Sequence, residues 1–267
     1  MKITSKLVLF SFTSVLLLAA CSGNGKKLNF NTFTVQQDRE LGAQVAAEID
    51  ANQTEYPLLD SASNTEVYAY LYAMRDKILN SGNVVYKDEF PWRLRIIQDD
   101  STLNAFCTPG GYIYVYTGLM RYLDSEDQLA GVLGHEIGHA DLRHSTRQMT
   151  KSNSLSMLLA VLAGDRAMLQ QLTSTIVNLK FSRNHETEAD EASVRYLCPT
   201  DYNADAGAKF FEKIQAEGGA GQPEFLSTHP APANRIENFK KVRTEMGCTG
   251  EQEYKNEHQR ILSLLPR

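Results

Sequence analysis

The sequence predicts an α+β protein that is mainly helical and carries one small sheet with an antiparallel edge. Apolar residues recur at helical spacing over most of the 267-residue chain, whereas a single region near residue 100 alternates and is rich in aromatic and β-branched residues. No internal repeat or low-complexity tract is found. The length suffices for one large domain or two small ones.

The first twenty residues have the layout of a lipoprotein signal peptide. Lys2 and Lys6 make the start positive, Leu7–Leu18 is mostly apolar but too short to span a bilayer comfortably, and two alanines precede Cys21. Leu18-Ala19-Ala20-Cys21 also resembles a bacterial lipoprotein box, which implies that residues 1–20 are removed and that Cys21 is lipidated. An ordinary signal peptide or an uncleaved anchor is the alternative.

Residues 21–35 begin with a polar stretch and are expected to form a flexible, lipidated tether. Ser22 stands where an aspartate is associated with retention in the inner membrane, which favours the outer membrane. The sequence thus predicts a periplasm-facing lipoprotein of the bacterial cell envelope, attached to the membrane through its N-terminal lipid only. The formal net charge is −5 and there is no basic cluster, so nucleic acid is not expected as a partner.

The first half of the folded chain is expected to combine helices with the strands of the sheet. In chain order, the expected elements are helices over residues 35–49 and 65–79 and strands over residues 92–97 and 104–117. Pro109-Gly110-Gly111 interrupts the last of these regions. Its second part, Tyr112–Thr117, is expected to offer a free edge to an extended peptide.

The second half is expected to be helical. Ser125 or Asp124 can cap a helix that begins near Glu126 and runs through His139 to about His144. Further helices are expected over residues 155–163, 182–197, 204–216 and 233–246. The apolar run at 155–163 is too short to cross a membrane. Residues 249–267 are expected to form a polar C-terminal tail.

Besides Cys21, three cysteines remain, an odd number for an exported protein. Cys198 and Cys248 each follow an expected helix, so a disulfide between them is possible, although sequence alone does not give connectivity. Cys107 would then be free, and we expect it to be a small buried residue on a strand.

The chemistry-bearing feature is a His-Glu-x-x-His motif. His135 and His139 are four residues apart, so on a helix both imidazoles project from one side and can bind one zinc ion at about 2.0–2.1 Å. Glu136 can then face a water molecule without binding the metal itself. By composition, such a motif arises by chance in at most about one chain in a hundred of this length. The sequence therefore predicts one zinc ion per chain.

A third ligand is expected downstream. The metzincin continuation needs a histidine six residues after the second ligand, and none is there. Glu186 and Asp190 share a helix face, so one can bind the metal while the other accepts a hydrogen bond from a ligating imidazole. On a continuous helix His144 would point away from the metal, toward solvent or in a supporting role, and Glu188 would lie on the opposite side of its helix.

Four motifs occur in a fixed order: Asn104-Ala105-Phe106 leading into Pro109-Gly110-Gly111, Gly134-His135-Glu136-Ile137-Gly138-His139, Glu186-x-x-x-Asp190, and His229-Pro230-x-x-x-x-Arg235. Together they resemble the zinc metallopeptidases of the CAAX prenyl protease type, and within them the soluble periplasmic members. The resemblance covers about residues 36–246 and implies a gluzincin-type metallopeptidase domain over residues 36–248.

The resemblance also implies a role for each motif residue. It implies zinc ligands at His135, His139 and Glu186, a catalytic base at Glu136, and a carboxylate that orients a ligand at Asp190. His229 corresponds to a catalytic-site histidine that can sit near the metal and either restrain activity or assist the transition state, with Arg235 as a possible helper. Cys107 departs from the small apolar residue that relatives often have, and no tetratricopeptide repeats follow the domain as they do in some members.

The function expected from these features is a zinc-dependent endopeptidase that cleaves misfolded or unassembled exported proteins of the envelope. One alternative is a chaperone-like assembly factor for envelope proteins with a latent metal site. Another is a peptide deformylase, which also uses a His-Glu-x-x-His helix. That class needs an upstream cysteine ligand in a Glu-Gly-Cys setting, which Cys107 lacks, and leaves Glu186 and Asp190 unexplained.

Overall fold

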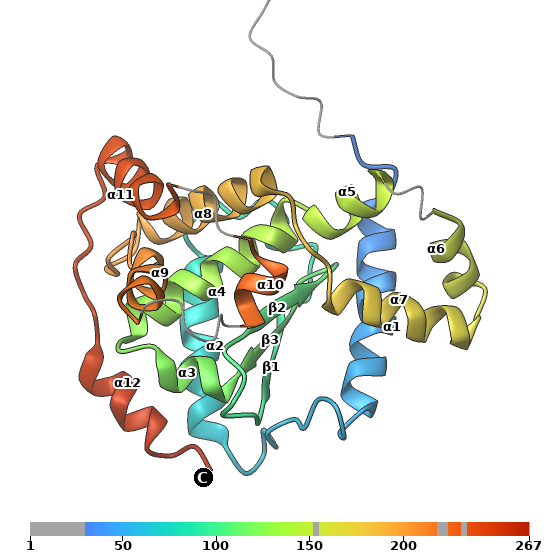
Figure 1. Cartoon of the computed structure of the whole chain (residues 1–267), viewed down its shortest axis with the longest axis horizontal. Helices are drawn as coiled ribbons and strands as arrows, with labels where there is room; N and C mark the ends of the chain where they lie inside the picture. Colours follow the sequence, from blue (N-terminus) through green and yellow to red (C-terminus); the bar gives the residue numbers. More distant parts are fainter. Residues whose placement is uncertain (1–29, 152–154, 218–223, 231–233, 267) are drawn as a thin grey trace, which may run out of the picture.

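The computed structural model describes residues 30–151, 155–217, 224–230 and 234–266 (Figure 1). The predicted signal peptide, Cys21 and most of the predicted tether lie outside these residues. The elements in chain order are α1 (Val35–Ala51), α2 (Thr65–Leu79), β1 (Arg93–Ile97), β2 (Ala105–Thr108), β3 (Tyr112–Tyr116), α3 (Thr117–Tyr122), α4 (Glu126–Asp141), α5 (His144–Lys151), α6 (Leu155–Leu162), α7 (Arg166–Val177), α8 (Arg183–Leu197), α9 (Gly207–Ala216), α10 (Glu224–Thr228), α11 (Arg235–Met246) and α12 (Lys255–Leu262).

The sheet has three strands in the order β1-β3-β2. β1 runs parallel to β3, and β2 runs antiparallel to it with Cys107 opposite Ile113. The predicted class, mainly helical with one small antiparallel-edged sheet, is confirmed. The expectation that Tyr112–Thr117 forms a free edge is wrong: β3 is the central strand because both neighbours bond to it, and β2 is the antiparallel edge.

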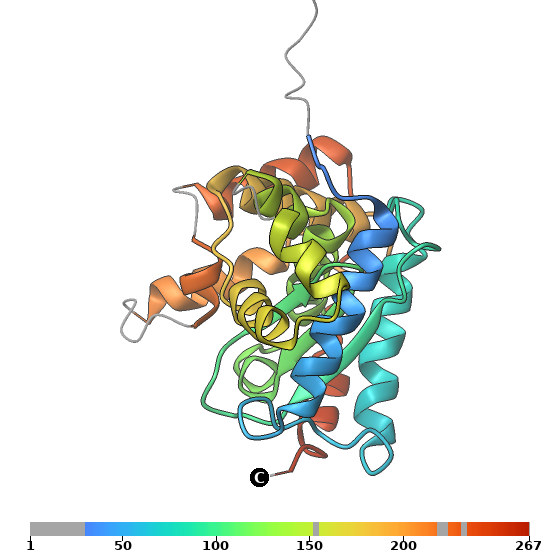
Figure 2. The ribbon, with the colours of Figure 1, turned by 90° about the vertical axis from the view of Figure 1, so that its right-hand side faces the viewer.

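Helices cover both faces of this sheet. On one face, Ile113 and Val115 join the larger apolar core, which includes residues of α2, α4 and α8. On the other face, Phe106 and Tyr114 stack at 4.9 Å and join a second core with α1 and α7. α1 and α7 pack directly on each other and lie side by side in the view of Figure 2. Alternation along the strands thus divides the apolar residues between two cores.

Helix α4 is the centre of the larger core and is buried along almost its whole length. It lies between α8 and the sheet, with α9 also against it (Figure 1). Glycines let these helices approach closely: a Cβ on Gly131 would lie 2.5 Å from the backbone nitrogen of Gly207, and one on Gly138 would lie 3.2 Å from the carbonyl oxygen of Ala189. The low helix propensity of glycine is therefore offset by packing.

α4 is shorter than expected. It ends at Asp141 rather than near His144, because Arg143 adopts the left-handed conformation with φ 57° and His144 begins a separate helix, α5. Among the described residues, no helix is long and apolar enough to cross a membrane.

The C-terminal segment is also more structured than expected. Residues 249–267 were expected to be a polar tail, but they contain α12, whose Ile261 and Leu262 are buried in the larger core. His258 is also buried, and its ring contacts Tyr70 and the carbonyl oxygens of Met120 and Leu123. The other polar residues of α12 are exposed or half-buried, so composition alone concealed an amphipathic helix.

Cys198 and Cys248 form a disulfide across a separation of 50 residues, which settles the pairing that the sequence left open. The bond joins the end of α8 to the residues that follow α11. Cys107 is the free cysteine of the described residues and is buried, as expected.

Reducing this disulfide should destabilise the domain. Because the bond closes a long loop, its loss should lower the free energy of unfolding by about 2–4 kcal/mol. Urea unfolding with and without reductant measures the change. Cys198→Ser/Cys248→Ser provides the control, since it should already have the lower stability and show no further response to reductant.

Candidate metal centre

Four buried side chains from separate parts of the chain converge beside α4. His135, His139, Glu186 and His229 each offer one nitrogen or oxygen atom, and these atoms lie within 4.8 Å of one another. α4 supplies the two predicted histidines, the first turn of α8 supplies Glu186, and His229 follows α10 directly. The structure therefore brings together the predicted ligands and His229.

The local sequence explains why Glu186 reaches this point. Ser182 caps α8, and its hydroxyl accepts a hydrogen bond from the backbone of His185. α8 then packs against α4 along the glycine face, where a Cβ on Gly134 would lie 2.8 Å from Oγ of Ser193. The carboxylate of Glu186 is thereby directed at the histidines of the neighbouring helix.

The distances fit a single cation between three donors. Nε2 of His139 lies 2.9 Å from Nε2 of His135, and the two nitrogens lie 3.4 and 3.5 Å from the carboxylate oxygens of Glu186. Two imidazoles and one carboxylate are the donor set of many catalytic zinc sites. Oε2 of Glu186 is buried and has no hydrogen-bond partner among the described residues, so this oxygen is available to bind a cation.

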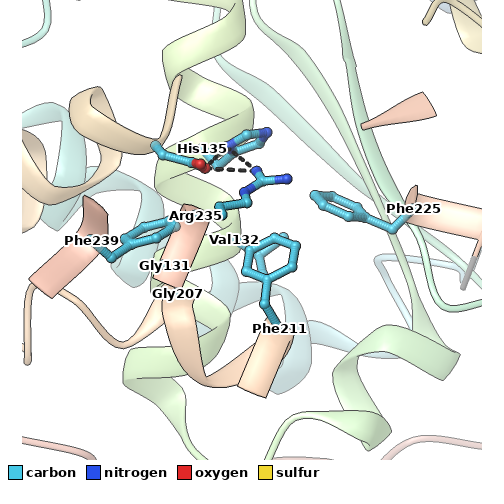
Figure 3. Close-up of a pocket in the computed structure, with 9 residues that line it drawn as sticks. Gly131, Val132, His135, Gly207, Phe211, Phe225, Arg235 and Phe239 are labelled. Carbon is cyan, nitrogen blue, oxygen red and sulfur yellow. Dashed lines mark hydrogen bonds and ion pairs between the residues drawn. The ribbon is translucent and has the colours of Figure 1, made fainter. Parts of the chain in front are cut away.

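The carboxylate of Asp190 bonds to the ring nitrogen of His135 that faces away from the other ligands. Nδ1 of His135 lies 2.8 Å from Oδ1 of Asp190, so its Nε2 is left free to face the cluster. Arg235 donates to the same oxygen at 2.7 Å and lies 3.3 Å from Glu186, and Figure 3 shows the guanidinium between the histidine and the apolar rings. Phe211 lies under the guanidinium at 4.0 Å. Arg235 thus neutralises buried carboxylates that α8 alone would leave unpaired.

The arginine adjoins a small cavity of about 10 Å³ (Figure 3). Phe225 and Phe239 form part of its apolar lining. Nε and Nη1 of Arg235 are buried and have no hydrogen-bond partner among the described residues. The cavity is comparable to the space that one water molecule needs.

Glu136 lies beside the converging ligand atoms and is not one of them. Its side chain is buried, and neither carboxylate oxygen has a hydrogen-bond partner among the described residues. Burial raises the pKa of Glu136 to about 7, although His229, 3.7 Å away, acts in the opposite direction. A carboxylate with this pKa can take up and release a proton near neutral pH.

His229 faces two acidic groups of the site, Glu186 and Glu136. Its Nδ1 lies 3.3 Å from Oε1 of Glu186 and 3.3 Å from Nε2 of His135. Burial by itself would lower the pKa of His229, but the charges of Glu186 and Glu136 outweigh it and raise the pKa. Burial would conversely raise the pKa of Glu186, but His229 and the hydrogen bond from His139 lower it.

Several neighbours of the site were not foreseen from the sequence. Phe181 stacks on His139 at 4.0 Å and Phe225 stacks on His229 at 4.3 Å. His144, expected to point away from the metal toward solvent or in a supporting role, lies fully buried behind His139 with its two ring nitrogens engaged, so the supporting position is the one observed. No sequence pattern signalled these contacts, because they depend on turns between helices.

Cys107 lies close enough to Glu136 for the carboxylate to affect its thiol. Burial and the charge of Glu136 together raise the pKa of Cys107 well above its usual value, so the thiol stays protonated. Cys107 is absent from the group of converging ligand atoms found among the described residues. A deformylase site with a cysteine ligand is therefore not supported.

The fold and the site define a metallopeptidase in which a His-Glu-x-x-His helix is completed by a glutamate from a later helix. Comparison with known proteins gives the family: residues 69–243 match the model of peptidase family M48. The chain belongs to this family. The zinc metallopeptidase predicted from the sequence is confirmed at that level, and zinc is the metal that the donor set fits.

Curated relatives agree with this assignment. The chain is 27% identical over 232 residues to the beta-barrel assembly-enhancing protease of Escherichia coli, covering 81% of this chain and 46% of that protein. It is 34% identical over 148 residues to the mitochondrial metalloendopeptidase OMA1 of Arabidopsis thaliana, covering 54% of this chain and 30% of that protein. The chain thus spans less than half the length of these relatives.

Removing a ligand should remove the metal. The purified protein should hold one zinc ion per chain, and His139→Ala and Glu186→Gln should each reduce the zinc content to near zero, because the remaining donors cannot retain it after dialysis. Elemental analysis measures the content. Glu191→Gln, at a half-buried position on the same helix as Glu186 and outside the group of converging ligand atoms, should keep its zinc. Retention of zinc by both ligand variants would contradict the assignment.

Proposed function

We propose that this protein is a zinc-dependent endopeptidase of the bacterial cell envelope that cleaves misfolded or unassembled exported proteins. The observation that carries the proposal is the convergence of His135, His139 and Glu186 with Glu136 beside them, fully enclosed by the fold. The first two histidines and Glu186 would hold the metal. When bound, zinc supplies polarisation of the scissile carbonyl and makes water more acidic.

The protein's own residues supply the proton transfers. Glu136, with its pKa raised to about 7 by burial, accepts a proton from the attacking water and delivers it to the departing amide nitrogen. Asp190 holds the proton on Nδ1 of His135, so this ring keeps its orientation during the reaction. Arg235 balances the charge of Asp190 and Glu186 at the back of the site.

The extended substrate is proposed to bind along the outer edge of β2. The carbonyl groups of Asn104 and Thr108 accept hydrogen bonds from Tyr116 and Gly111, so the alternate residues Ala105 and Cys107 direct their backbone groups away from β3. Among the described residues, no other element bonds to these backbone groups. Addition of a strand here recognises backbone more than side chains, which suits a broad range of unfolded substrates.

Two contacts around β2 support the proposal of a restrained state. Ala105 is 1% exposed, and α10 is attached next to the start of β2 because the backbone of Phe225 donates to the carbonyl of Leu103 at 3.2 Å. His229 follows on from α10, and its backbone donates to the carbonyl of Phe225. We propose that His229 occupies the space that water and substrate need and that it leaves when substrate enters.

The location and the substrate class are proposed on other grounds. The signal-like residues 1–20, the tether and Cys21 support a lipoprotein held at the envelope by its lipid, at the outer membrane in preference to the inner. The E. coli relative is named for its effect on beta-barrel assembly, which supports exported proteins as substrates.

A second function deserves a test because the site is so fully covered. The protein could act mainly as a chaperone-like assembly factor with a latent metal site. If Glu136→Gln restores the wild-type phenotype to a strain that lacks the gene, this second function is favoured. If Glu136→Gln fails to restore it, proteolysis is favoured.

Glu136→Gln should abolish cleavage and leave zinc in place. Glutamine keeps the shape of the side chain but cannot accept the proton, so the rate of casein digestion should fall by at least about 100-fold. Digestion by the wild-type protein should also stop when a chelator is added. Cleavage that persists at the wild-type rate in Glu136→Gln would contradict the proposed mechanism.

His229→Ala should increase cleavage. If the covered state predominates, removal of the imidazole should raise the population that accepts substrate and accelerate casein digestion by about threefold or more. Zinc content, measured in parallel, should stay at one per chain because three ligands remain. A fall in the rate with unchanged zinc would show instead that His229 assists the transition state.

A further inference from the structure

We infer that His144 is a positioning residue of the metal site: with Glu188 behind it, it fixes the ring orientation and the tautomer of His139. The inference rests on the proposed role of His139 as a zinc ligand. It concerns a histidine and a glutamate that the proposed reaction does not use.

The contacts form one continuous chain from the cluster to the surface. Nδ1 of His139 lies 2.9 Å from Nδ1 of His144, and Nε2 of His144 lies 3.1 Å from Oε2 of Glu188. Arg147 donates to the same oxygen of Glu188 at 2.8 Å. Both imidazoles are fully buried, whereas the side chain of Glu188 is 38% exposed.

Only one placement of protons in this series of hydrogen bonds leaves Nε2 of His139 available to bind a metal. If Nε2 of His139 binds zinc, its proton must sit on Nδ1. The facing Nδ1 of His144 must then accept, so His144 carries its own proton on Nε2 and donates it to the carboxylate of Glu188. Every nitrogen in the chain thus has a defined role, with the acceptor Glu188 at its end.

The two predicted histidine ligands are therefore supported in different ways. His135 donates directly to Asp190, which is 1% exposed. His139 reaches a carboxylate only through the intervening ring of His144. Stacking restrains this longer connection, because His185 lies on His144 at 4.4 Å with an interplanar angle of 8°.

The break between α4 and α5 places His144 where its ring can face Nδ1 of His139. On a continuous helix His144 would lie about 140° around the axis from His139. Arg143, in the left-handed conformation, turns the chain instead. Its guanidinium bonds to the buried carboxylate of Asp38 and donates to the carbonyl oxygen of Phe33 at 2.6 Å. A non-glycine residue keeps this conformation only where its surroundings enforce it.

The test compares two substitutions of His144 in the full chain. His144→Leu removes the acceptor that faces His139, whereas His144→Asn keeps an oxygen near the position of Nδ1. The zinc dissociation constant, measured by chelator competition, should rise about 10–100-fold in His144→Leu and change by less than about threefold in His144→Asn. The visible spectrum of the cobalt-substituted protein should change in His144→Leu only.

The zinc-loaded protein gives an independent readout. Nitrogen NMR of labelled histidine should show a hydrogen-bonded Nδ1 proton on His139 in the wild type and in His144→Asn, and an Nδ1 proton without that hydrogen bond in His144→Leu. Glu188→Ala should weaken zinc binding in the same direction, and Glu191→Ala on the same helix provides the matched control. If His144→Leu does not fold, Glu188→Ala still tests the inference.

The outcomes separate this inference from the proposed function. If His139→Ala also leaves zinc binding intact, His139 is not a ligand and the proposed site is wrong. If His139→Ala loses zinc while His144→Leu and Glu188→Ala bind it as the wild type does, the positioning role alone is overturned.

Discussion

The close packing of α4 against α8 is the constraint on which the rest of the structure depends. α4 carries His135, Glu136 and His139, and α8 carries Glu186, so the metal centre exists only at this contact. The backbones can approach because glycines line the face of α4: a Cβ on Gly134 or Gly138 would meet Ser193 or Ala189 at 2.8 and 3.2 Å. Rigid helices on both sides then hold the donors within bonding reach of one ion.

The buried carboxylates of the site require opposite charges nearby, and the neighbouring arginine and histidine side chains supply them. Asp190 and Glu186 share Arg235, and Glu186 also faces His229. The two carboxylate oxygens of Glu136 have no hydrogen-bond partner among the described residues, and burial raises the pKa of Glu136 to about 7. A buried charge without a partner costs several kcal/mol, so a cluster of this kind is stable only with counter-charges in place. The bound metal completes that balance.

The sequence predicted what depends on local spacing. Residues four apart share a helix face, so the pairs His135–His139 and Glu186–Asp190 were accessible from the sequence, and the resemblance to a family joined them into one site. The features that could not be predicted depend on contacts between residues far apart in the sequence. His144 depends on the turn at Arg143, which is fixed by Asp38 more than a hundred residues earlier in the chain. β3 is central because of strand order, which alternation of residues does not determine.

The central claim is that His135, His139 and Glu186 bind one zinc ion, with His229 near it. X-ray absorption at the zinc edge of the metal-loaded protein tests this most directly. We expect only nitrogen and oxygen to bind the metal, at about 2.0–2.2 Å, with the scattering pattern of at least two imidazoles. A sulfur neighbour at about 2.3 Å, which only a cysteine such as Cys107 could provide, or fewer than two imidazoles would contradict it.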